Sequence, residues 1–254
     1  MTQARFRKHE KGSALVYILI AIALLAVLTV TFMEPSSQQT SSQNTFKTLT
    51  EVESQANVIR SALQECVLSY PKGDGAIDNT GGGSDPDARK NYPINPDSTY
   101  YATATPARSG DREVRNIRCP GNNPGGANVD DHELIFAGGE GKFLPPPPDL
   151  FGEWQYYNGI DGIFFWTATD KSDAFLLAAL TKLDDKFAEC ESDIIDATGG
   201  AEDLNSGGDL ECAGTNVCFR VWMIMNNTEA VFNGDADGDE TDPAPPNSDC
   251  SSGD

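Results

Sequence analysis

Acidic residues near the C-terminal end are spaced as in the opening of a calcium-binding loop. Asn233, Asp235 and Asp237 occupy alternate positions, and Gly238 follows in the sixth place. Alternating oxygen ligands surround a hard cation well, and glycine permits the sharp turn that such a loop makes. The twelfth place, where a bidentate glutamate normally closes the loop, holds Ala244. The motif is therefore incomplete.

A shorter loop would have to be closed by Asp239, Glu240 or Asp242. Two interpretations stay open. In the first, calcium is a cofactor held by carboxylate and amide oxygens, with the candidate ligands Asn233, Asp235, Asp237, Asp239 and Asp242. In the second, this stretch is a solvated acidic tail held near the fold by Cys250.

His132 is the one histidine outside the first dozen residues, and its neighbours are Asp130, Asp131 and Glu133. A carboxylate could orient such a histidine as a general base. No G-x-S-x-G, H-E-x-x-H or P-loop motif accompanies it. We therefore interpret His132 as an exposed polar residue beside a strand, and we predict that the chain is not an enzyme.

The six cysteines could form disulfides or bind a metal ion. All of them follow an apolar segment near the N-terminus: Cys66, Cys119, Cys190, Cys212, Cys218 and Cys250. They form no C-x-x-C pair, and the chain has only two histidines, so a zinc site is poorly supported. An even count in a domain outside the cytoplasm favours disulfides over buried free thiols. The sequence does not choose among the pairings.

The chain is strongly acidic, with a formal net charge of −21 over 254 residues. Phosphate groups are repelled by such a surface, so nucleic acid is excluded as a partner. The positive charge is concentrated at the start, where Arg5, Arg7, Lys8 and Lys11 face a single acid, Glu10.

An uncharged run of 20 residues, 14–33, follows this basic start. A helix of that length spans roughly 30 Å, the thickness of the hydrocarbon core of a membrane. No A-x-A pattern follows the run, which argues against a cleaved secretory signal. Because the next basic residue is Lys47, the positive-inside rule predicts a single-pass protein of the cytoplasmic (inner) membrane. Its N-terminus is expected in the cytoplasm and its C-terminal part in the periplasm or outside the cell.

Apolar residues then recur at three- and four-residue steps, as on one face of a helix: Phe46, Leu49, Val52, Ala56, Ile59 (or Val58) and Leu63. Residues 14 to about 68 are therefore predicted to form one long helix, with Pro35 at the end of its apolar half.

Beyond this helix, aromatic and β-branched residues predict strands at 153–157 and 162–167, with a turn at 158–161. A helix is expected from the N-cap Ser172 to about Glu189, and a strand at 217–225 that pairs with 228–232. We also expect a short strand at 132–137 and a long surface loop at 72–97. The predicted fold is α+β: a long N-terminal helix packed on an antiparallel β-sheet head with at least one extra helix.

The first 68 residues resemble the type IV pilin and pseudopilin family in the basic leader ending in Gly12, the uncharged run, Pro35 and the amphipathic continuation. The resemblance implies that a prepilin peptidase cleaves between Gly12 and Ser13 and methylates the new N-terminus. It also implies other pilin-like subunits and the inner membrane as partners. Most family members carry glutamate at the fifth mature position, which here is Tyr17. That departure favours a minor or tip-type subunit over the major one.

The resulting domain prediction is a leader at 1–12, a transmembrane half-helix at 13–35, an amphipathic half-helix at 36–68 and an extracytoplasmic, disulfide-containing head at 69–254. The expected function is that of a structural minor pilin or pseudopilin-like subunit of a type IV pilus or type II secretion-like filament. The alternative is a signal-anchored extracytoplasmic binding protein. An anchored enzyme ranks last.

Overall fold

The computed structural model describes residues 13–33, 37–74, 89–102, 110–121, 132–137, 142–159, 161–171, 173–188, 191–205, 207–208, 210–214 and 216–225. The chain divides into two compact units, residues 1–44 and residues 45–254.

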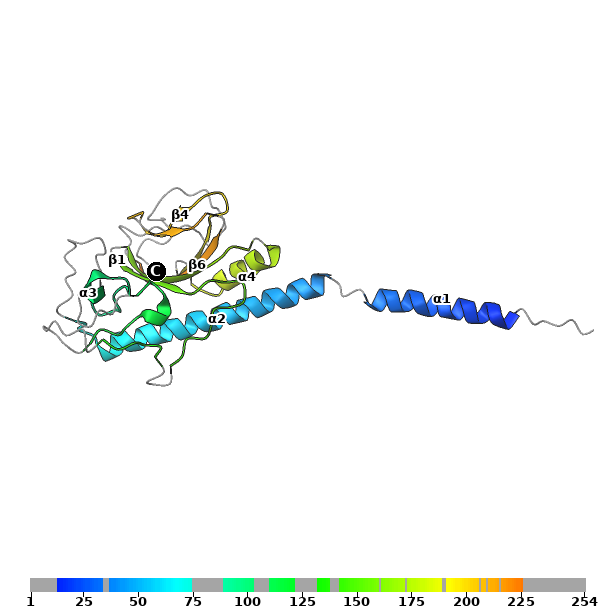
Figure 1. The fold of residues 1–254 in the computed structure, drawn as a ribbon, viewed down its shortest axis with the longest axis horizontal. Coiled ribbons are helices and arrows are strands. Elements are labelled where there is room, and N and C mark those ends of the chain that lie inside the picture. Colours follow the sequence, from blue (N-terminus) through cyan, green and yellow to red (C-terminus); the bar gives the residue numbers. More distant parts are fainter. Residues whose placement is uncertain are drawn as a thin grey trace, which may run out of the picture. The chain divides into compact units, whose positions relative to one another are not determined.

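Helices and strands alternate irregularly along the chain (Figure 1). The helices are α1 (Ser13–Met33), α2 (Ser37–Ser69), α3 (Thr99–Ala102), the 3₁₀ helix η1 (Val114–Asn116) and α4 (Ala174–Asp184). The strands are β1 (Gln155–Gly159), β2 (Gly162–Thr169), β3 (Ser192–Asp196), β4 (Glu202–Asp203), β5 (Glu211–Cys212) and β6 (Val217–Met225). Residues 34–36 lie outside the described residues, so the predicted continuity of α1 with α2 does too.

The head is built on a four-stranded sheet with the order β1-β2-β6-β3, in which every neighbouring pair is antiparallel. Strands β4 and β5 form a separate antiparallel pair. The prediction of an α+β fold with an antiparallel sheet and further helices is confirmed. The predicted strands at 153–157, 162–167 and 217–225 correspond to β1, β2 and β6, whereas 228–232 lies outside the described residues.

The two faces of the sheet carry separate hydrophobic clusters, because side chains alternate along a strand. Phe165 and Phe219 belong to a cluster with the buried side chains of α2 and α4. Phe164, Trp166 and Trp222 belong to a second cluster, which Leu204 and Leu210 of the β4–β5 segment cover. The sheet therefore lies between α2 and the β4–β5 segment (Figure 1).

The buried stripe of α2 follows the predicted spacing in all but its first member. Leu49, Val52, Ala56, Ile59 and Leu63 are buried, which selects Ile59 over Val58, whose side chain is exposed. Phe46 is 72% exposed, so its predicted place in the stripe is wrong. Thr45 and Thr48 take the buried face at this end, and the Thr45 hydroxyl donates to the backbone oxygen of Phe175 at 3.4 Å.

The turn predicted at 158–161 is wrong in its first half, because β1 continues to Gly159. Gly159 pairs with Gly162, so Asn158 and Gly159 belong to the strand. Asn158 is buried, and its amide nitrogen donates to the backbone oxygens of Arg89 and Pro93, each at 3.0 Å. These tertiary hydrogen bonds outweigh the local preference of the Asn-Gly pair for a turn.

The extra helix is present but shorter than predicted. Its N-cap is Asp173, without a side-chain capping bond, and the helix ends at Asp184 rather than near residue 189. The chain then turns, with hydrogen bonds from the backbone nitrogens of Asp185 and Lys186 to Thr181 and Leu183, and it returns to the sheet as β3. The chain leaves the helical path at Asp185, and the segment that follows brings the ring of Phe187 to 5.9 Å from that of Phe219 on β6. Strand β3 was not predicted from the sequence.

The short strand predicted at 132–137 is wrong. Leu134 forms only an isolated antiparallel bridge with Arg118, and residues 135–136 make a turn. Ile135 points into the core between α2 and the sheet instead of continuing a ladder. The long loop predicted at 72–97 is also buried at both of its described ends, where Asp74, Ile94 and Asn95 have no exposed surface.

Candidate functional site

Helix α1 carries the most unusual surface of the described residues. Ser13, the residue after the expected cleavage, is its first residue, while Gly12 and Pro35 lie outside the described residues. The side chains of α1 are described from Leu15 to Val27, and every one of them is exposed and uncharged. Tyr17 is 69% exposed.

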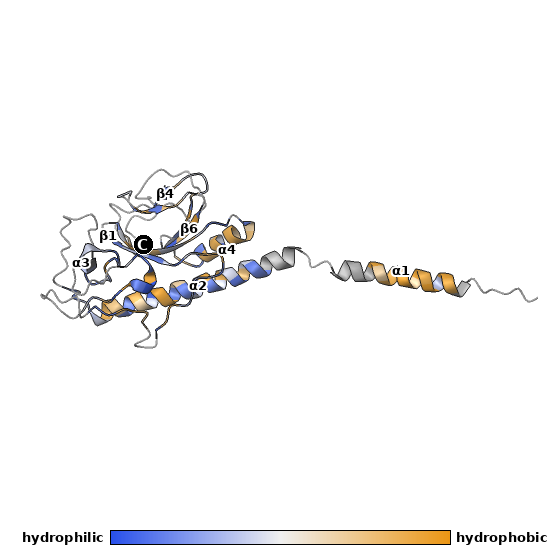
Figure 2. Cartoon of the chain, viewed as in Figure 1, coloured by the Kyte–Doolittle hydropathy of each residue, from blue (hydrophilic) through white to orange (hydrophobic). Residues whose placement is uncertain are grey.

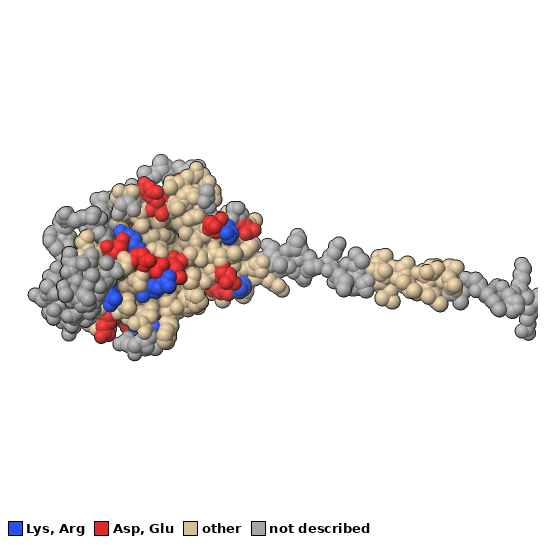
Figure 3. Space-filling view, in the orientation of Figure 1, with Lys and Arg blue, Asp and Glu red and all other residues tan. Residues whose placement is uncertain are grey.

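Polar residues form no stripe on the described part of α1, in contrast to the mixed surface of α2 (Figure 2). Figure 3 likewise shows no charged side chain there, whereas acidic and basic side chains lie side by side on the visible face of the head. Within the described residues, no helix has both the length and the apolarity that are needed to cross a membrane.

Four of the six cysteines fall within the described residues, and all four are in disulfides. Cys66, in the last turns of α2, is bonded to Cys119, and Cys212 of β5 is bonded to Cys218 of β6. The prediction of disulfides is confirmed for these four. Cys190 and Cys250 lie outside the described residues.

The acidic calcium candidates at 233–242 also lie outside the described residues. Within the part of the chain that the structure describes, no group of three or more histidine, cysteine, aspartate or glutamate side chains is arranged to hold a metal ion. The calcium hypothesis therefore keeps its basis in the sequence.

His132 is buried, with 1% of its surface exposed, so the prediction of an exposed residue is wrong. Its Nε2 lies 2.9 Å from Oδ2 of Asp74, and its Nδ1 lies 3.1 Å from the hydroxyl of Tyr101. The Tyr100 hydroxyl donates to the same Asp74 oxygen at 2.6 Å. A carboxylate accepts hydrogen bonds, so this arrangement fits a histidine that donates from Nε2 and accepts on Nδ1.

The order Tyr101–His132–Asp74 is formally that of a nucleophile, a base and an orienting carboxylate. Tyr101, however, has no exposed surface, so no substrate reaches its hydroxyl. Burial, together with the hydrogen bond to Asp74, raises the pKa of Tyr100 well above its usual range, which keeps that phenol protonated. The cluster joins the segment after α2, helix α3 and residue 132 by hydrogen bonds.

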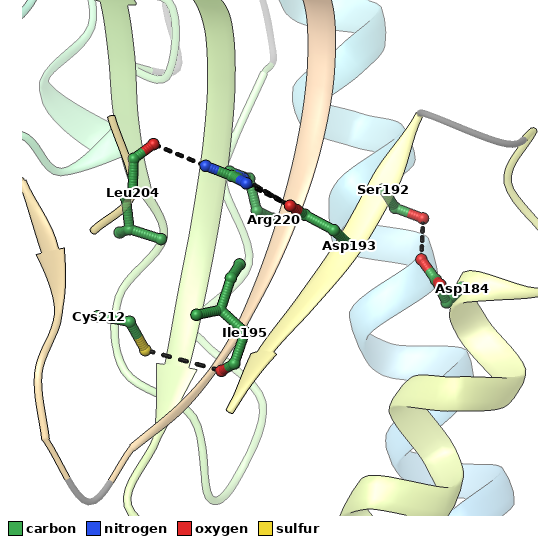
Figure 4. Close-up of polar contacts among 7 residues, drawn as sticks. All are labelled: Asp184, Ser192, Asp193, Ile195, Leu204, Cys212 and Arg220. Carbon is green, nitrogen blue, oxygen red and sulfur yellow. Dashed lines mark hydrogen bonds and ion pairs between the residues drawn. The ribbon is translucent and has the colours of Figure 1, made fainter. Parts of the chain in front are cut away.

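A second buried polar cluster centres on Arg220 of β6 (Figure 4). Its Nε donates to both carboxylate oxygens of Asp193, at 2.9 and 3.1 Å, and its Nη2 also bonds that carboxylate. Its Nη1 donates to the backbone oxygen of Leu204 at 2.6 Å. The guanidinium carbon lies 5.1 Å from the ring centre of Phe164 and 4.6 Å from that of Trp222.

Arg220 therefore ties the β4–β5 segment to the sheet, and the Cys212–Cys218 disulfide ties it again. Figure 4 also draws a contact of 3.9 Å between Sγ of Cys212 and the backbone oxygen of Ile195. A disulfide sulfur has no hydrogen to donate, so this is a packing contact.

Asp184, at the end of α4, accepts a hydrogen bond from the hydroxyl of Ser192 on β3 (Figure 4). Burial raises the pKa of Asp184 to about 6, and the nearby charges of Asp193 and Asp185 add to the rise, while the Ser192 hydrogen bond opposes it. This carboxylate therefore titrates in a mildly acidic range.

Sequence reasoning missed Arg220 and Asp193, although one signal was present. Arg220 stands alone in the middle of an apolar strand, and a charge there requires a buried partner. The buried cluster around His132 had no comparable signal, because its members lie far apart in the sequence.

The comparisons with known proteins supply no relative. No family model, no curated protein and no solved structure matches the chain.

Proposed function

We propose that this protein is a minor or tip-type pilin-like subunit: a structural component of a type IV pilus or type II secretion-like filament. A prepilin peptidase removes residues 1–12, and the new N-terminal amine, on Ser13, is methylated. The mature chain then assembles with other pilin-like subunits through its N-terminal helix. It is held in the inner membrane with its head outside the cytoplasm.

The exposed apolar side chains of α1 carry this proposal. Ten large ones between Leu15 and Val27 are more than half exposed. Complete burial of one such side chain is worth about 1.5 to 3 kcal/mol, so leaving all of them in water costs on the order of 10 kcal/mol. That cost is comparable with the whole stability of a domain, so lipid or apolar helices of other subunits must cover them.

The head supports the same proposal in two ways. The buried stripe of α2 packs on an antiparallel sheet, which is the arrangement expected of a pilin-like head. Its disulfides fit an oxidising compartment outside the cytoplasm.

Tyr17 favours a minor or tip position. A carboxylate at this position of the helix would pair with the terminal amine of a neighbouring subunit, and a tyrosine supplies no such charge. Filaments built mainly from this chain would therefore lack that pairing at every step.

Processing of the leader tests the proposal. In the native cell, the wild-type chain and the control variant Thr2→Leu should both lose the leader, whereas Gly12→Leu should remain as the longer precursor in the membrane fraction. The three chains can be compared by immunoblot. A signal-anchored binding protein needs no such cleavage, so three chains of equal, unprocessed length would favour that alternative and refute the proposal.

A further inference from the structure

A pocket of about 150 Å³ opens in the head where three strands of the sheet end beside the start of α4. Thr169 is the last residue of β2, Asp196 the last of β3 and Val217 the first of β6, and all three line the pocket. The sheet therefore fixes one wall of the pocket in a rigid frame.

The other wall is apolar and comes from α4. Leu176 and Leu180 are almost fully buried at its base, while Leu177 stands at the rim with 47% of its surface exposed. Water in contact with such a wall is readily displaced by an apolar group.

The size of the pocket limits what it can hold. An apolar cavity of about 150 Å³ accommodates a benzene ring, whereas sites for cofactors and drug-sized ligands are about 300 to 1,000 Å³. The pocket therefore suits one side chain of the size of leucine or phenylalanine.

The charge around the opening of the pocket limits which residues can lie next to that side chain in a binding partner. Asp173, Asp196 and Lys171 are exposed around the opening, and the Lys171 ammonium is paired with Asp170 at 2.8 Å. Three acids and one base leave a formal charge of −2. The N-terminus of α4 adds only about half a positive charge, so the opening stays negative.

The same charge argues against the C-terminal segment of this chain as the occupant. Residues 226–254 carry eight acidic residues and no lysine or arginine. An acidic segment would be repelled by the acidic rim.

We propose that this pocket binds a partner protein through one large apolar side chain flanked by lysine or arginine. The apolar side chain fills the space beside Leu176 and Leu180, and the flanking cations lie against Asp173 and Asp196. This inference stands on the pocket alone and does not depend on the filament assignment.

Three blocked tripeptides serve as probes: Lys-Phe-Lys, Lys-Ala-Lys and Glu-Phe-Glu. They are titrated into the full chain in nanodiscs of zwitterionic lipid, and binding is followed by the methyl resonances of Leu176 and Leu180. Lys-Phe-Lys should give saturable shifts. Lys-Ala-Lys should bind at least about tenfold more weakly because it lacks the ring. Glu-Phe-Glu should bind several-fold more weakly, and added salt should reduce that difference.

Matched variants locate the site. Leu177→Ala should weaken Lys-Phe-Lys at least about threefold, whereas Leu150→Ala, at a leucine that is 43% exposed and outside the pocket, should leave its binding unchanged. Asp196→Asn keeps an acceptor for the backbone nitrogen of Thr198 and removes one charge, so it should weaken Lys-Phe-Lys and strengthen Glu-Phe-Glu.

Each contrary result overturns the proposal. The absence of saturable shifts, or equal binding of Lys-Phe-Lys and Lys-Ala-Lys, would show that the pocket takes no side chain. Equal binding of the basic and acidic peptides would refute the role of the rim. Equal effects of Leu177→Ala and Leu150→Ala would place the binding elsewhere.

Discussion

Removal of one partner of the Arg220–Asp193 pair should destabilise the head far more than removal of both. Neither side chain has any exposed surface. The pair is held by several charge-assisted hydrogen bonds, and Arg220 also donates to Leu204. We consider Asp193→Val, which suits a strand, and Arg220→Met, whose flexible side chain can still pack between Phe164 and Trp222.

Each single variant leaves one charge buried without its counter-ion, and such a loss costs about 3 to 5 kcal/mol. The double variant leaves no charge at this site without its counter-ion. Its main remaining cost is the backbone oxygen of Leu204 without a donor, which is about 1 to 3 kcal/mol. The two single costs therefore add up to more than the cost of the double variant, and the coupling energy should be at least about 2 kcal/mol.

The assay is urea unfolding of a chain that begins at Thr45, the start of the second compact unit, with its disulfides intact and tryptophan fluorescence as the signal. The matched control is the pair Lys47–Asp149. Its charged atoms are 3.4 Å apart, and its side chains are 60% and 90% exposed. A double-mutant cycle on this control should give a coupling of about 0 to 1 kcal/mol.

Equal coupling energies for the buried and the exposed pair would refute this reasoning. So would a double variant as unstable as the sum of the two single variants, because the cost would then come from lost packing instead of an uncompensated charge.

Three further predictions concern the head. The pKa of Asp184 is raised to about 6 from 3.8, so this carboxyl contributes stability below about pH 4 that is lost as the pH rises through 6. In urea unfolding, Asp184→Asn should be as stable as wild type at pH 3.5. At pH 7.5 it should be more stable by about 1 to 2 kcal/mol, after allowance for solvent screening. Removal of the Cys66–Cys119 disulfide, whose cysteines are 53 residues apart, should lower the free energy of unfolding by about 4 kcal/mol. Removal of the Cys212–Cys218 disulfide, whose cysteines are 6 residues apart, should lower it by about 2 kcal/mol. Equal decreases in melting temperature for the two variants would contradict this argument from loop length. Calcium at 100 times its dissociation constant should stabilise the head by about 2.7 kcal/mol, and Asp235→Ala should abolish the effect; identical melting curves in calcium and in chelator would leave only a solvated acidic tail.

The strongly patterned elements of the head could be predicted from the sequence. Strand β6 has the predicted bounds, because its run of aromatic and β-branched residues is a local signal. The stripe of α2 was equally visible from Leu49 onward. The prediction was wrong for Phe46 because Thr45 and Thr48 lie on the buried face at that end, and the spacing of apolar residues does not report buried threonines.

The buried polar clusters could not be predicted, because they depend on distant partners. Strand β3 reads Ser-Asp-Ile-Ile-Asp, and Asp193 can be buried there only because Arg220 lies opposite, 27 residues away. His132 is flanked by acidic residues that suggest exposure, yet its partner Asp74 comes from 58 residues away. Local sequence carries no record of such pairings.

The most direct test of the filament assignment is the intact mass of the protein extracted from membranes of its native cell. The proposal predicts a chain without residues 1–12 that begins at Ser13 and carries one methyl group on its terminal amine. A mass that corresponds to a chain beginning at Met1 or Thr2 would contradict it.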